Sequence, residues 1–447
     1  MRRVFIKTLG CKVNTFDSQV LEKKFSEEGY AIAASPEAAD IQVINSCSVT
    51  STAEKEARYL LRKMHRENPK ALRIITGCYA QVDSAHIRSL EAVDILVPNE
   101  VKDNLVSVVS DHLAGKNVLS EKMPLGTKAV DQNKQGHFKS ELTLFDRPST
   151  DRIRAFLKVQ DGCNGFCAYC LIPLARGASR SVDADLVLQK VKEIETSGAL
   201  ELVFAGIHLG DYGHDFAEDA PIRSLSALLE RVLADTTLRR FRISSLEPSE
   251  LSVELLETLA KRRDIFCDHF HLPLQSGSDK ILKLMGRSYD SAGYRQAVAL
   301  IRQYFPQAMI SADVIPGFPG EDDKDFEDTL QFIKDCQIDS LHVFPYSKRP
   351  NTRALKMPNH VASEVIKERA ARLRQLSKET KIAFAKSMFL TKARVLWESK
   401  DEATGRLIGK TTNYLDVVSR QGHDAALYTE ETLELHGFSD EGRILAI

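Results

Sequence analysis

Long hydrophobic runs are absent from this sequence of 447 residues, and so is a surplus of charge of either sign. No stretch approaches the ~20 apolar residues that a membrane-spanning helix needs. The first residues, MRRVFIKTLGC, contain no apolar run long enough for a signal peptide. We therefore expect a cytoplasmic protein without a membrane partner. The formal net charge of -1 gives no sign of nucleic-acid binding, so any such site must come from local clusters of charge.

The composition is that of a globular protein with a sizeable core. The chain is 43% hydrophobic and 28% charged, and its length suggests about two to four domains. It contains eight cysteines. Thiols stay reduced in the cytoplasm, so metal binding explains a cysteine pattern there better than disulfides do.

Residues 1–120 alternate between strand-like and helical patterns. The apolar runs VFIKTLG, IQVINS, LRIITG and VDILVP predict four strands, and a helical pattern extends from Asp17 to Glu28. Strands that alternate with helices predict a doubly wound parallel α/β domain. Residues 121–148 are polar and lack periodicity, which predicts a linker.

Residues 149–377 repeat the alternation six times. The strand-like runs are RAFLKVQ, ELVFAG, RFRISS, HFHLPL, MISADVIPG and LHVFPY. They predict a partial (β/α)6 barrel, in which the chemistry lies at the carboxyl ends of the strands. Residues 378–447 contain short strands with glycine-containing turns, which predict a small antiparallel β-barrel.

Cys163, Cys167 and Cys170 form a C-x3-C-x2-C loop in the run QDGCNGFCAYC. Three thiolates at this spacing can hold three corners of a [4Fe–4S] cluster and leave the fourth iron open. An amine and a carboxylate, as in S-adenosylmethionine, can chelate that iron, and reduction of the sulfonium then releases a carbon radical. The alternative is zinc, but zinc usually takes four ligands in two C-x2-C pairs, and this loop has no fourth cysteine or histidine nearby.

Cys11, Cys47 and Cys78 each lie just past a predicted strand of the first domain. The ends of parallel strands share one edge of a sheet, where ligands bind in open α/β folds, so these cysteines could hold a second cluster. The alternative is three buried structural thiols. Cys267 and Cys336 lack this placement and are interpreted as packing residues.

These motifs together resemble those of the methylthiotransferases, a branch of the radical S-adenosylmethionine (radical SAM) enzymes. The matching runs are TLGCKVN, NSCSVT, TGCYAQ and GCNGFCAYC, while GKTTNYLDV resembles the RNA-binding TRAM barrel. TLGCKVN and IPLARGASRS are most similar to the branch that modifies N6-threonylcarbamoyladenosine at position 37 of tRNA. Two other branches remain possible, acting on isopentenyladenosine in tRNA or on an aspartate of a ribosomal protein.

The resemblance implies replacement of the hydrogen on adenine carbon 2 by a methylthio group. It implies two [4Fe–4S] clusters, S-adenosylmethionine, and an electron donor such as flavodoxin or ferredoxin. Because the C–H bond is unactivated, we expect no catalytic acid or base beyond the cluster ligands. The residues that would contact S-adenosylmethionine are Tyr169, Gly206, Ser245, Glu247 and Ile315. Packing at strand ends is the alternative for each of them.

A tRNA anticodon stem-loop is the implied partner, and its contacts must come from local basic residues. The last domain, from Lys378 onward, has 10 Lys and Arg against 11 Asp and Glu, so it is not basic. Basic residues beside the predicted barrel mouth are better candidates, namely Arg154, Arg176, Arg180, Lys348 and Arg349. The rival from another class is a non-catalytic, metal-stabilised RNA-binding protein.

Overall fold

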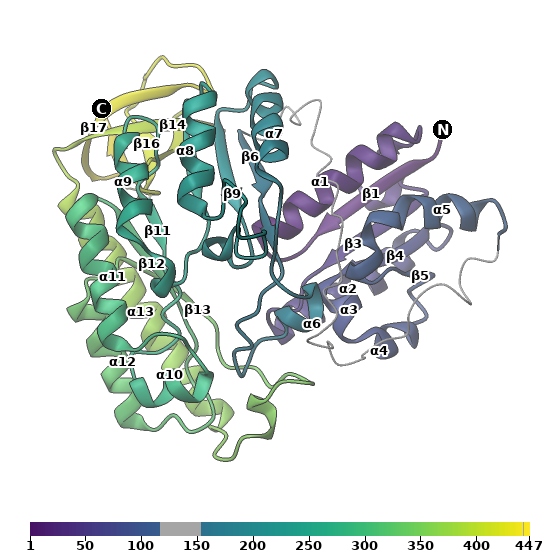
Figure 1. Cartoon of the computed structure of the whole chain (residues 1–447). Coiled ribbons are helices and arrows are strands. Elements are labelled where there is room, and N and C mark those ends of the chain that lie inside the picture. The colour runs from purple at the N-terminus through teal and green to yellow at the C-terminus, as the bar shows by residue number, and fades with distance from the viewer. Residues whose placement is uncertain (117–152, 441) are drawn as a thin grey trace.

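The computed structural model describes residues 1–116, 153–440 and 442–447, which form three units (Figure 1). An α/β unit that contains the N-terminus lies beside a larger central unit, and a small β-barrel lies at one end of the central unit. The predicted α/β class is confirmed, including the order of the three architectures along the chain. The linker predicted over residues 121–148 lies outside the described residues.

The N-terminal unit is a five-stranded parallel sheet with the strand order β2-β1-β3-β4-β5. Its elements are β1 (Arg3–Thr8), α1 (Lys12–Glu27), β2 (Ala31–Ile32), η1 (Pro36–Ala38), β3 (Ile41–Ser46), α2 (Ser51–Glu67), β4 (Leu72–Gly77), α3 (Cys78–Val82), α4 (Ser84–Arg88), β5 (Ile95–Leu96), η2 (Asn99–Asn104) and α5 (Leu105–Leu113). Every residue of β3 is buried, as expected for a central strand with helices on both faces.

Helix α1 begins at Lys12, so the prediction that this helix starts at Asp17 was wrong. Its first turns bury the polar residues Asn14 and Asp17, and these mask the apolar period that marks a helix. Asn14 is needed there because its Nδ2 donates to the carbonyl oxygens of Leu9 and Ser46, at 2.7 and 3.0 Å. The side chain thus ties the start of α1 to the ends of two strands.

The central unit contains six parallel strands in two three-stranded sheets, β10-β9-β6 and β11-β12-β13. A parallel bridge between Phe241 and Phe266 connects the two sheets into one partial barrel. The strands are β6 (Arg154–Lys158), β9 (Glu201–Ala205), β10 (Phe241–Ile243), β11 (His269–His271), β12 (Met309–Val314) and β13 (Ser340–Val343). A two-stranded extension, β7 (Gln160–Asp161) with β8 (Arg180–Ser181), follows β6.

Helices pack around the outside of this barrel and enclose the largest hydrophobic core of the protein. They are α7 (Ala184–Thr196), α8 (Leu225–Asp235), α9 (Val253–Lys261), α10 (Asp279–Met285), α11 (Ser291–Tyr304), α12 (Asp323–Asp335) and α13 (Ser363–Ser387), with short η3 (Leu209–Asp211), η4 (Pro248–Glu250) and η5 (Ala354–Lys356). Helix α6 (Ile172–Arg176) lies instead at the N-terminal unit, where it packs against α3. Helix α13 runs without interruption across the domain boundary predicted at residue 377.

The C-terminal unit is a closed five-stranded barrel in the order β14-β15-β16-β18-β17. Its strands are β14 (Lys392–Lys400), β15 (Leu407–Thr411), β16 (Asp416–Ser419), β17 (Glu430–Phe438) and β18 (Ile444–Ala446). The pairs are antiparallel except for β16 with β18, which is parallel. Gly409 is required where β14 and β15 meet, because a Cβ there would lie 2.5 Å from the carbonyl oxygen of Leu396 and 2.8 Å from the ring of Trp397.

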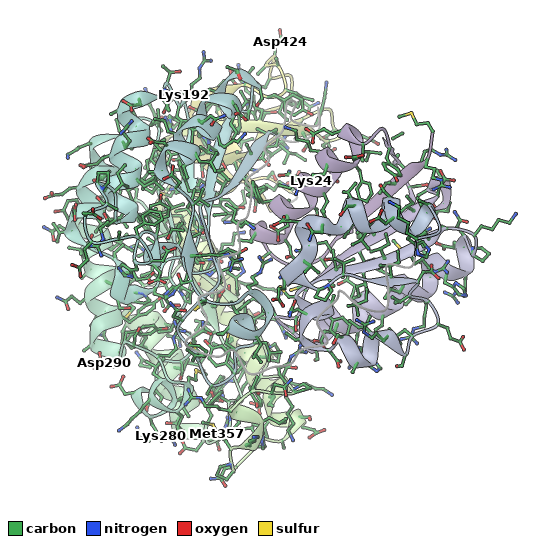
Figure 2. The ribbon with its side chains drawn as sticks, turned by 45° about the vertical axis from the view of Figure 1, so that its right-hand side comes forward. Lys24, Lys192, Lys280, Asp290, Met357 and Asp424 are labelled. Atoms are coloured by element: carbon green, nitrogen blue, oxygen red, sulfur yellow. The ribbon has the colours of Figure 1, made fainter. Side chains whose placement is uncertain are left out.

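The N-terminal unit contacts the central barrel along α1, which packs against β6. Figure 2 shows the side chains of both units, among them Lys24 of α1, which pairs with Asp103 within the N-terminal unit. At the other end of the chain, Met309 of β12 belongs to the hydrophobic core of the C-terminal barrel. None of the helices in the described ranges has the length and apolar character needed to cross a bilayer.

Candidate active site

The loop from Gly162 to Cys170 begins directly after β7, beyond the carboxyl end of β6. Gly162 has a φ of +76°, and a Cβ there would lie 1.9 Å from the carbonyl oxygen of Ala178, so the close approach requires glycine. The backbone N–H of Cys163 donates to the carbonyl of Gly177 at 3.1 Å. These contacts fold the loop back on itself and hold its three cysteines at the mouth of the barrel.

The loop trio, Cys163, Cys167 and Cys170, is surrounded by hydrogen-bond donors. The N–H to sulfur contacts are Gly165 to Cys163 at 3.3 Å, Arg287 to Cys167 at 3.0 Å and Ile172 to Cys170 at 3.4 Å. Donors aimed at sulfur stabilise the negative charge that metal-bound thiolates carry. Burial raises the pKa of the Cys170 thiol to about 12, so a strong positive partner such as a bound metal is needed to keep it ionised.

His208 adds a further charged group beside the loop trio. Its Nδ1 lies 3.7 Å from the sulfur of Cys163, and its Nε2 lies 2.6 Å from a carboxylate oxygen of Glu250. Burial opposes protonation, but the hydrogen bonds to Cys163 and Glu250 raise the pKa of His208 to about 11. Sequence reasoning missed this residue, although it lies two positions after Gly206 in the run FAGIHLG.

Arg287 links the loop trio to two of the predicted S-adenosylmethionine contacts. Its guanidinium donates to Cys167 and to the hydroxyl of Tyr169, the latter at 3.4 Å, and it forms an ion pair with Glu247. Ile315 belongs to the same hydrophobic cluster as Tyr169. The structure therefore brings Tyr169 and Glu247 together around one arginine, which no sequence motif marked, while Ile315 is connected to them only through its cluster with Tyr169.

The other two predicted contacts lie at neighbouring strand ends. Gly206 follows β9, and its N–H donates to the hydroxyl of Ser244 at 3.2 Å. A Cβ on Gly206 would lie 3.0 Å from Oε1 of Gln160, which is tighter than ordinary packing. Ser245 follows β10 and is half-buried. Both residues lie on the same side of the barrel as the loop trio, because parallel strands end at one side.

The sheet trio, Cys11, Cys47 and Cys78, lies past the ends of β1, β3 and β4, which are adjacent in the sheet. Gly10 has a φ of +102°, and a Cβ there would lie 2.7 Å from the sulfur of Cys47, so glycine allows the two loops to meet. Burial, together with the neighbouring thiols, raises the pKa of Cys47 to about 12. Cys47 and Cys78 are buried whereas Cys11 is exposed, so the trio opens to one side.

A buried ionic cluster, the junction network, connects the N-terminal unit to the central barrel. Its members are Asp17 of α1, Lys102 of η2, Lys158 of β6, Asp161 of β7 and Arg176 of α6. Asp17 accepts from Lys102 at 3.0 Å, from Lys158 at 2.8 Å and from Arg176 at 3.2 Å. Asp161 accepts from Lys158 and Arg176, each at 3.0 Å. Sequence reasoning missed the network, since its members are scattered over 160 positions.

The network holds both of its carboxyl groups ionised. Burial alone would favour the protonated acid, but the charges of Lys102, Lys158 and Arg176 keep the pKa of Asp17 well below its usual range. The charges of Lys158 and Arg176 lower the pKa of Asp161 in the same way. A buried charge requires such pairing, because an unpaired one is expensive in a low-dielectric interior.

Helix α6 brings the two trios to one place. It begins two residues after Cys170 and packs against α3, which begins at Cys78. Arg176 interacts electrostatically with both Cys78 and Cys11. Nδ2 of Asn99 lies 3.0 Å from the carbonyl oxygen of Ala175 and 3.8 Å from the sulfur of Cys78. The loop trio and the sheet trio thus both adjoin one short helix, the first just before it in the chain and the second through its contact with α3.

The basic residues predicted to bind RNA differ in their surroundings. Arg176 is buried in the junction network, and Arg349 is buried against Ser48 and Glu54. Arg154 pairs with Glu201 and Glu398. Arg180 donates to Asp161. Lys348 is exposed. Internal partners therefore occupy Arg154, Arg176 and Arg349 in this structure, and Lys348 presents its charge to solvent.

The donor sets fit iron–sulfur clusters in their chemistry. Each trio supplies three thiols with no acidic side chain among them, as a [4Fe–4S] cluster with one open iron requires. In the described ranges, no group of three or more His, Cys, Asp or Glu side chains is arranged to hold a metal ion directly. A four-iron cluster needs its three sulfurs further apart than a single ion does.

A parallel partial barrel with a three-cysteine loop at its mouth defines a radical SAM domain. The model of the radical SAM superfamily matches residues 157–333, and that of the uncharacterized protein family UPF0004 matches residues 3–98. Among solved structures, the radical S-adenosylmethionine methyltransferase TsrM from Kitasatospora setae is similar in fold. Its TM-score is 0.55 at 14% identity, over 79% of this chain and 77% of that one.

Curated relatives narrow the class to one family. The threonylcarbamoyladenosine tRNA methylthiotransferase MtaB of Bacillus subtilis is 36% identical over 95% of this chain and 92% of its own length. The MtaB of Aquifex aeolicus is 35% identical over 94% and 97%. The tRNA-2-methylthio-N(6)-dimethylallyladenosine synthase of Pelotomaculum thermopropionicum is 30% identical over 94% and 92%. The chain belongs to the tRNA methylthiotransferase family, and the resemblance read from its motifs is confirmed.

Proposed function

We propose that this chain replaces the hydrogen on carbon 2 of N6-threonylcarbamoyladenosine, at position 37 of tRNA, by a methylthio group. The observation that carries the proposal is the attachment of two cysteine trios to one helix, α6. A reaction that needs a radical source and a sulfur source requires two such centres near a single substrate atom. The relatives named for threonylcarbamoyladenosine reach 36% identity, compared with 30–31% for those named for dimethylallyladenosine.

The loop trio would hold the radical cluster, and the sheet trio would hold the cluster that carries sulfur. When bound, these clusters and S-adenosylmethionine supply the one-electron reduction, the radical, the sulfur and the methyl group. The protein's own residues bind and orient. Arg287 positions Glu247 and Tyr169 for the ribose and adenine of S-adenosylmethionine, and Gly206, Ser245 and Ile315 complete that site.

We assign a separate role in the reaction to each of the three structural units. The proposed domains are residues 1–120, which hold the sulfur-carrying cluster, and 149–377, which hold the radical cluster, with 121–148 as the linker. The C-terminal barrel of residues 378–447 would bind tRNA, and Lys348 is the predicted basic residue with a free solvent face. The anticodon stem-loop is the expected part of the tRNA, because a target base must be unpaired to enter a pocket. A flavodoxin or ferredoxin would supply the electrons.

The test is the nucleoside content of tRNA from a strain that lacks this chain and any redundant enzyme. We expect loss of the 2-methylthio derivative and accumulation of unmodified N6-threonylcarbamoyladenosine, measured by mass spectrometry. Anaerobically prepared protein should contain about eight irons per chain, as two [4Fe–4S] clusters require. Persistence of the methylthio nucleoside would refute the proposal. Loss of 2-methylthio-isopentenyladenosine, or of the ribosomal-protein modification, would assign the chain to another branch.

A further inference from the structure

The outer face of helix α2 carries a line of basic side chains. Lys55, Arg62 and Arg66 are exposed, and Tyr59, which lies between them, is 58% exposed. Positions i, i+4, i+7 and i+11 lie on one side of a helix, so these four side chains form a single line, the α2 stripe. The buried residues of α2 lie on the opposite side. At a rise of 1.5 Å per residue, the stripe is about 16 Å long.

The charges of the α2 stripe are not neutralised from within the described ranges. None of its three cations forms an ion pair there, and Arg62 donates to a backbone carbonyl of its own helix at 3.2 Å. The acidic residues Glu56 and Glu67 lie on the flank of the helix beside Lys63, which pairs with Glu67 at 3.7 Å. The stripe therefore presents three positive charges to solvent, and its own face carries no carboxylate.

A comparison with α13 distinguishes this stripe from an ordinary solvated face. A charged helix face is usually only solvated, and such a face mixes the two signs of charge. On α13, the exposed Lys367 and Arg374 are seven residues apart, as Lys55 and Arg62 are, but the exposed Glu364 lies on the same face. The α2 stripe instead combines charge of one sign with an aromatic residue, which is typical of surfaces that bind nucleic acid.

The first turn of α2 is held beside the mouth of the barrel. Arg349, in the segment after β13, donates to the hydroxyl of Ser48 at 2.8 Å and forms an ion pair with Glu54. Its neighbour Lys348 is exposed. A helix between two parallel strands crosses from one edge of the sheet to the other, so α2 starts at the edge where Cys47 lies and ends at the far edge. The stripe thus leads outward from the barrel mouth.

We propose that the α2 stripe binds the phosphate backbone of the anticodon stem while position 37 of the tRNA occupies the barrel mouth. The inference rests on the proposed function, because it names a second surface for that substrate. A base that reaches the two cysteine trios comes from the unpaired loop, so the paired stem must extend away from the mouth. A line of cations about 16 Å long can follow several phosphates of one strand, and Tyr59 can donate its hydroxyl to a phosphate oxygen.

The experiment measures how an anticodon stem-loop RNA binds to cluster-loaded enzyme, by fluorescence anisotropy at several salt concentrations. The neutralised variant combines Lys55→Gln, Arg62→Gln and Arg66→Gln. At unchanged iron content, we expect it to bind roughly 10- to 100-fold more weakly at low salt. The slope of log affinity against log salt should become shallower by about 2–3, since each lost phosphate contact removes about 0.7–0.9. KM should rise with little change in kcat, because the stripe lies outside the reacting centre.

Two further variants separate the position of the charges from their number. Lys192→Gln, Lys334→Gln and Arg374→Gln together remove three exposed positive charges from α7, α12 and α13, which surround the outside of the central barrel. This matched control should bind within about threefold of the unaltered enzyme. The pair Arg62→Lys with Arg66→Lys keeps the charge of the stripe, and it should retain most of the affinity and the salt dependence.

The outcomes decide between the stripe and its rivals. Unchanged binding by the neutralised variant, or an equal loss in the matched control, overturns the inference. RNAs with unmodified adenosine and with N6-threonylcarbamoyladenosine at position 37 should lose affinity equally, because phosphates make the contact, and a loss confined to the modified RNA also overturns it. If the neutralised variant keeps its affinity for RNA but is reduced more slowly by a flavodoxin, the stripe is a docking site for an electron donor and the inference is wrong.

Failure of the proposed function gives a different result. An unaltered enzyme that binds the stem-loop RNA without methylthiolating its threonylcarbamoyladenosine refutes that function, while the binding of the variants still decides whether the stripe holds the backbone. An unaltered enzyme that does not bind the RNA overturns both.

Discussion

Substitution of Arg176 by methionine would remove the central cation of the junction network. The guanidinium donates to Asp161 at 3.0 and 3.2 Å, to Asp17 at 3.2 Å and to the side-chain oxygen of Asn14 at 2.5 Å. Breaking a buried ion pair by removing one partner costs ~3–5 kcal/mol. Lys158 still neutralises part of the charge on both carboxylates, so we expect a loss of about 3 kcal/mol in the free energy of unfolding. Arg176→Lys keeps the charge but loses the planar guanidinium that binds both oxygens of Asp161. It should lower the free energy of unfolding by about 1–2 kcal/mol.

Urea unfolding of anaerobically prepared protein, followed by far-UV circular dichroism, measures this cost. Arg88→Met, at an exposed position of α4, is the matched control and should stay within about 0.5 kcal/mol of the unaltered protein. The double variant Arg176→Met with Asp161→Asn should show a coupling energy of at least about 1 kcal/mol, because the two side chains are in contact. If Arg176→Met were as stable as Arg88→Met, the network would not hold the two units together and the reasoning would fail.

Three further outcomes follow from the same contacts. Cys11→Ala should reduce iron from about eight to about four per chain and abolish methylthiolation while leaving cleavage of S-adenosylmethionine, whereas Cys336→Ala should change neither. The pKa of Asp17 is lowered on folding, so the unfolded chain binds more protons. The urea midpoint should therefore be constant above about pH 5 and fall below it, and a flat profile down to pH 3 would contradict this. Glu201→Gln removes the carboxylate that pairs with Arg240 and Arg242, two buried arginines that donate to backbone carbonyls of the C-terminal barrel. It should lower the free energy of unfolding reported by Trp397 fluorescence by about 3 kcal/mol.

The parts of the fold that follow from local pattern could be predicted, and those that depend on tertiary contact could not. Apolar strands alternating with helices identified both α/β units, and the rule that parallel strands end at one edge grouped Cys11, Cys47 and Cys78. The start of α1 was mistaken because Asp17 is buried as an ion partner, where a helix usually carries an apolar residue. Arg176 was interpreted as an RNA contact because sequence shows its charge and not its partners.

The same limitation explains why the residues around the loop trio were missed. Arg287 comes from the turn after α10 and His208 from the segment after β9, so neither lies near the cysteines in sequence. Each is brought to the mouth of the barrel because parallel strands and their connections converge there. Cysteine motifs are visible because thiols are rare and their spacing is short. The charged groups that surround them belong to common residue types, and only the fold selects which of them matter.

Stability alone does not explain why the junction between the two units is ionic. Well-packed apolar side chains of similar volume often stabilise a protein as well as a buried ion pair does, or better. An ionic junction differs in being directional, because a guanidinium fork fixes the orientation of the carboxylates that it binds. Asp17 connects α1 to α6 in this way, and α1 begins with Lys12 directly after Cys11. The orientation that Arg176 imposes on Asp17 therefore determines the position of Cys11 and Lys12 relative to the barrel. An apolar junction of equal stability would allow α1 to shift along the barrel, and this position would no longer be fixed.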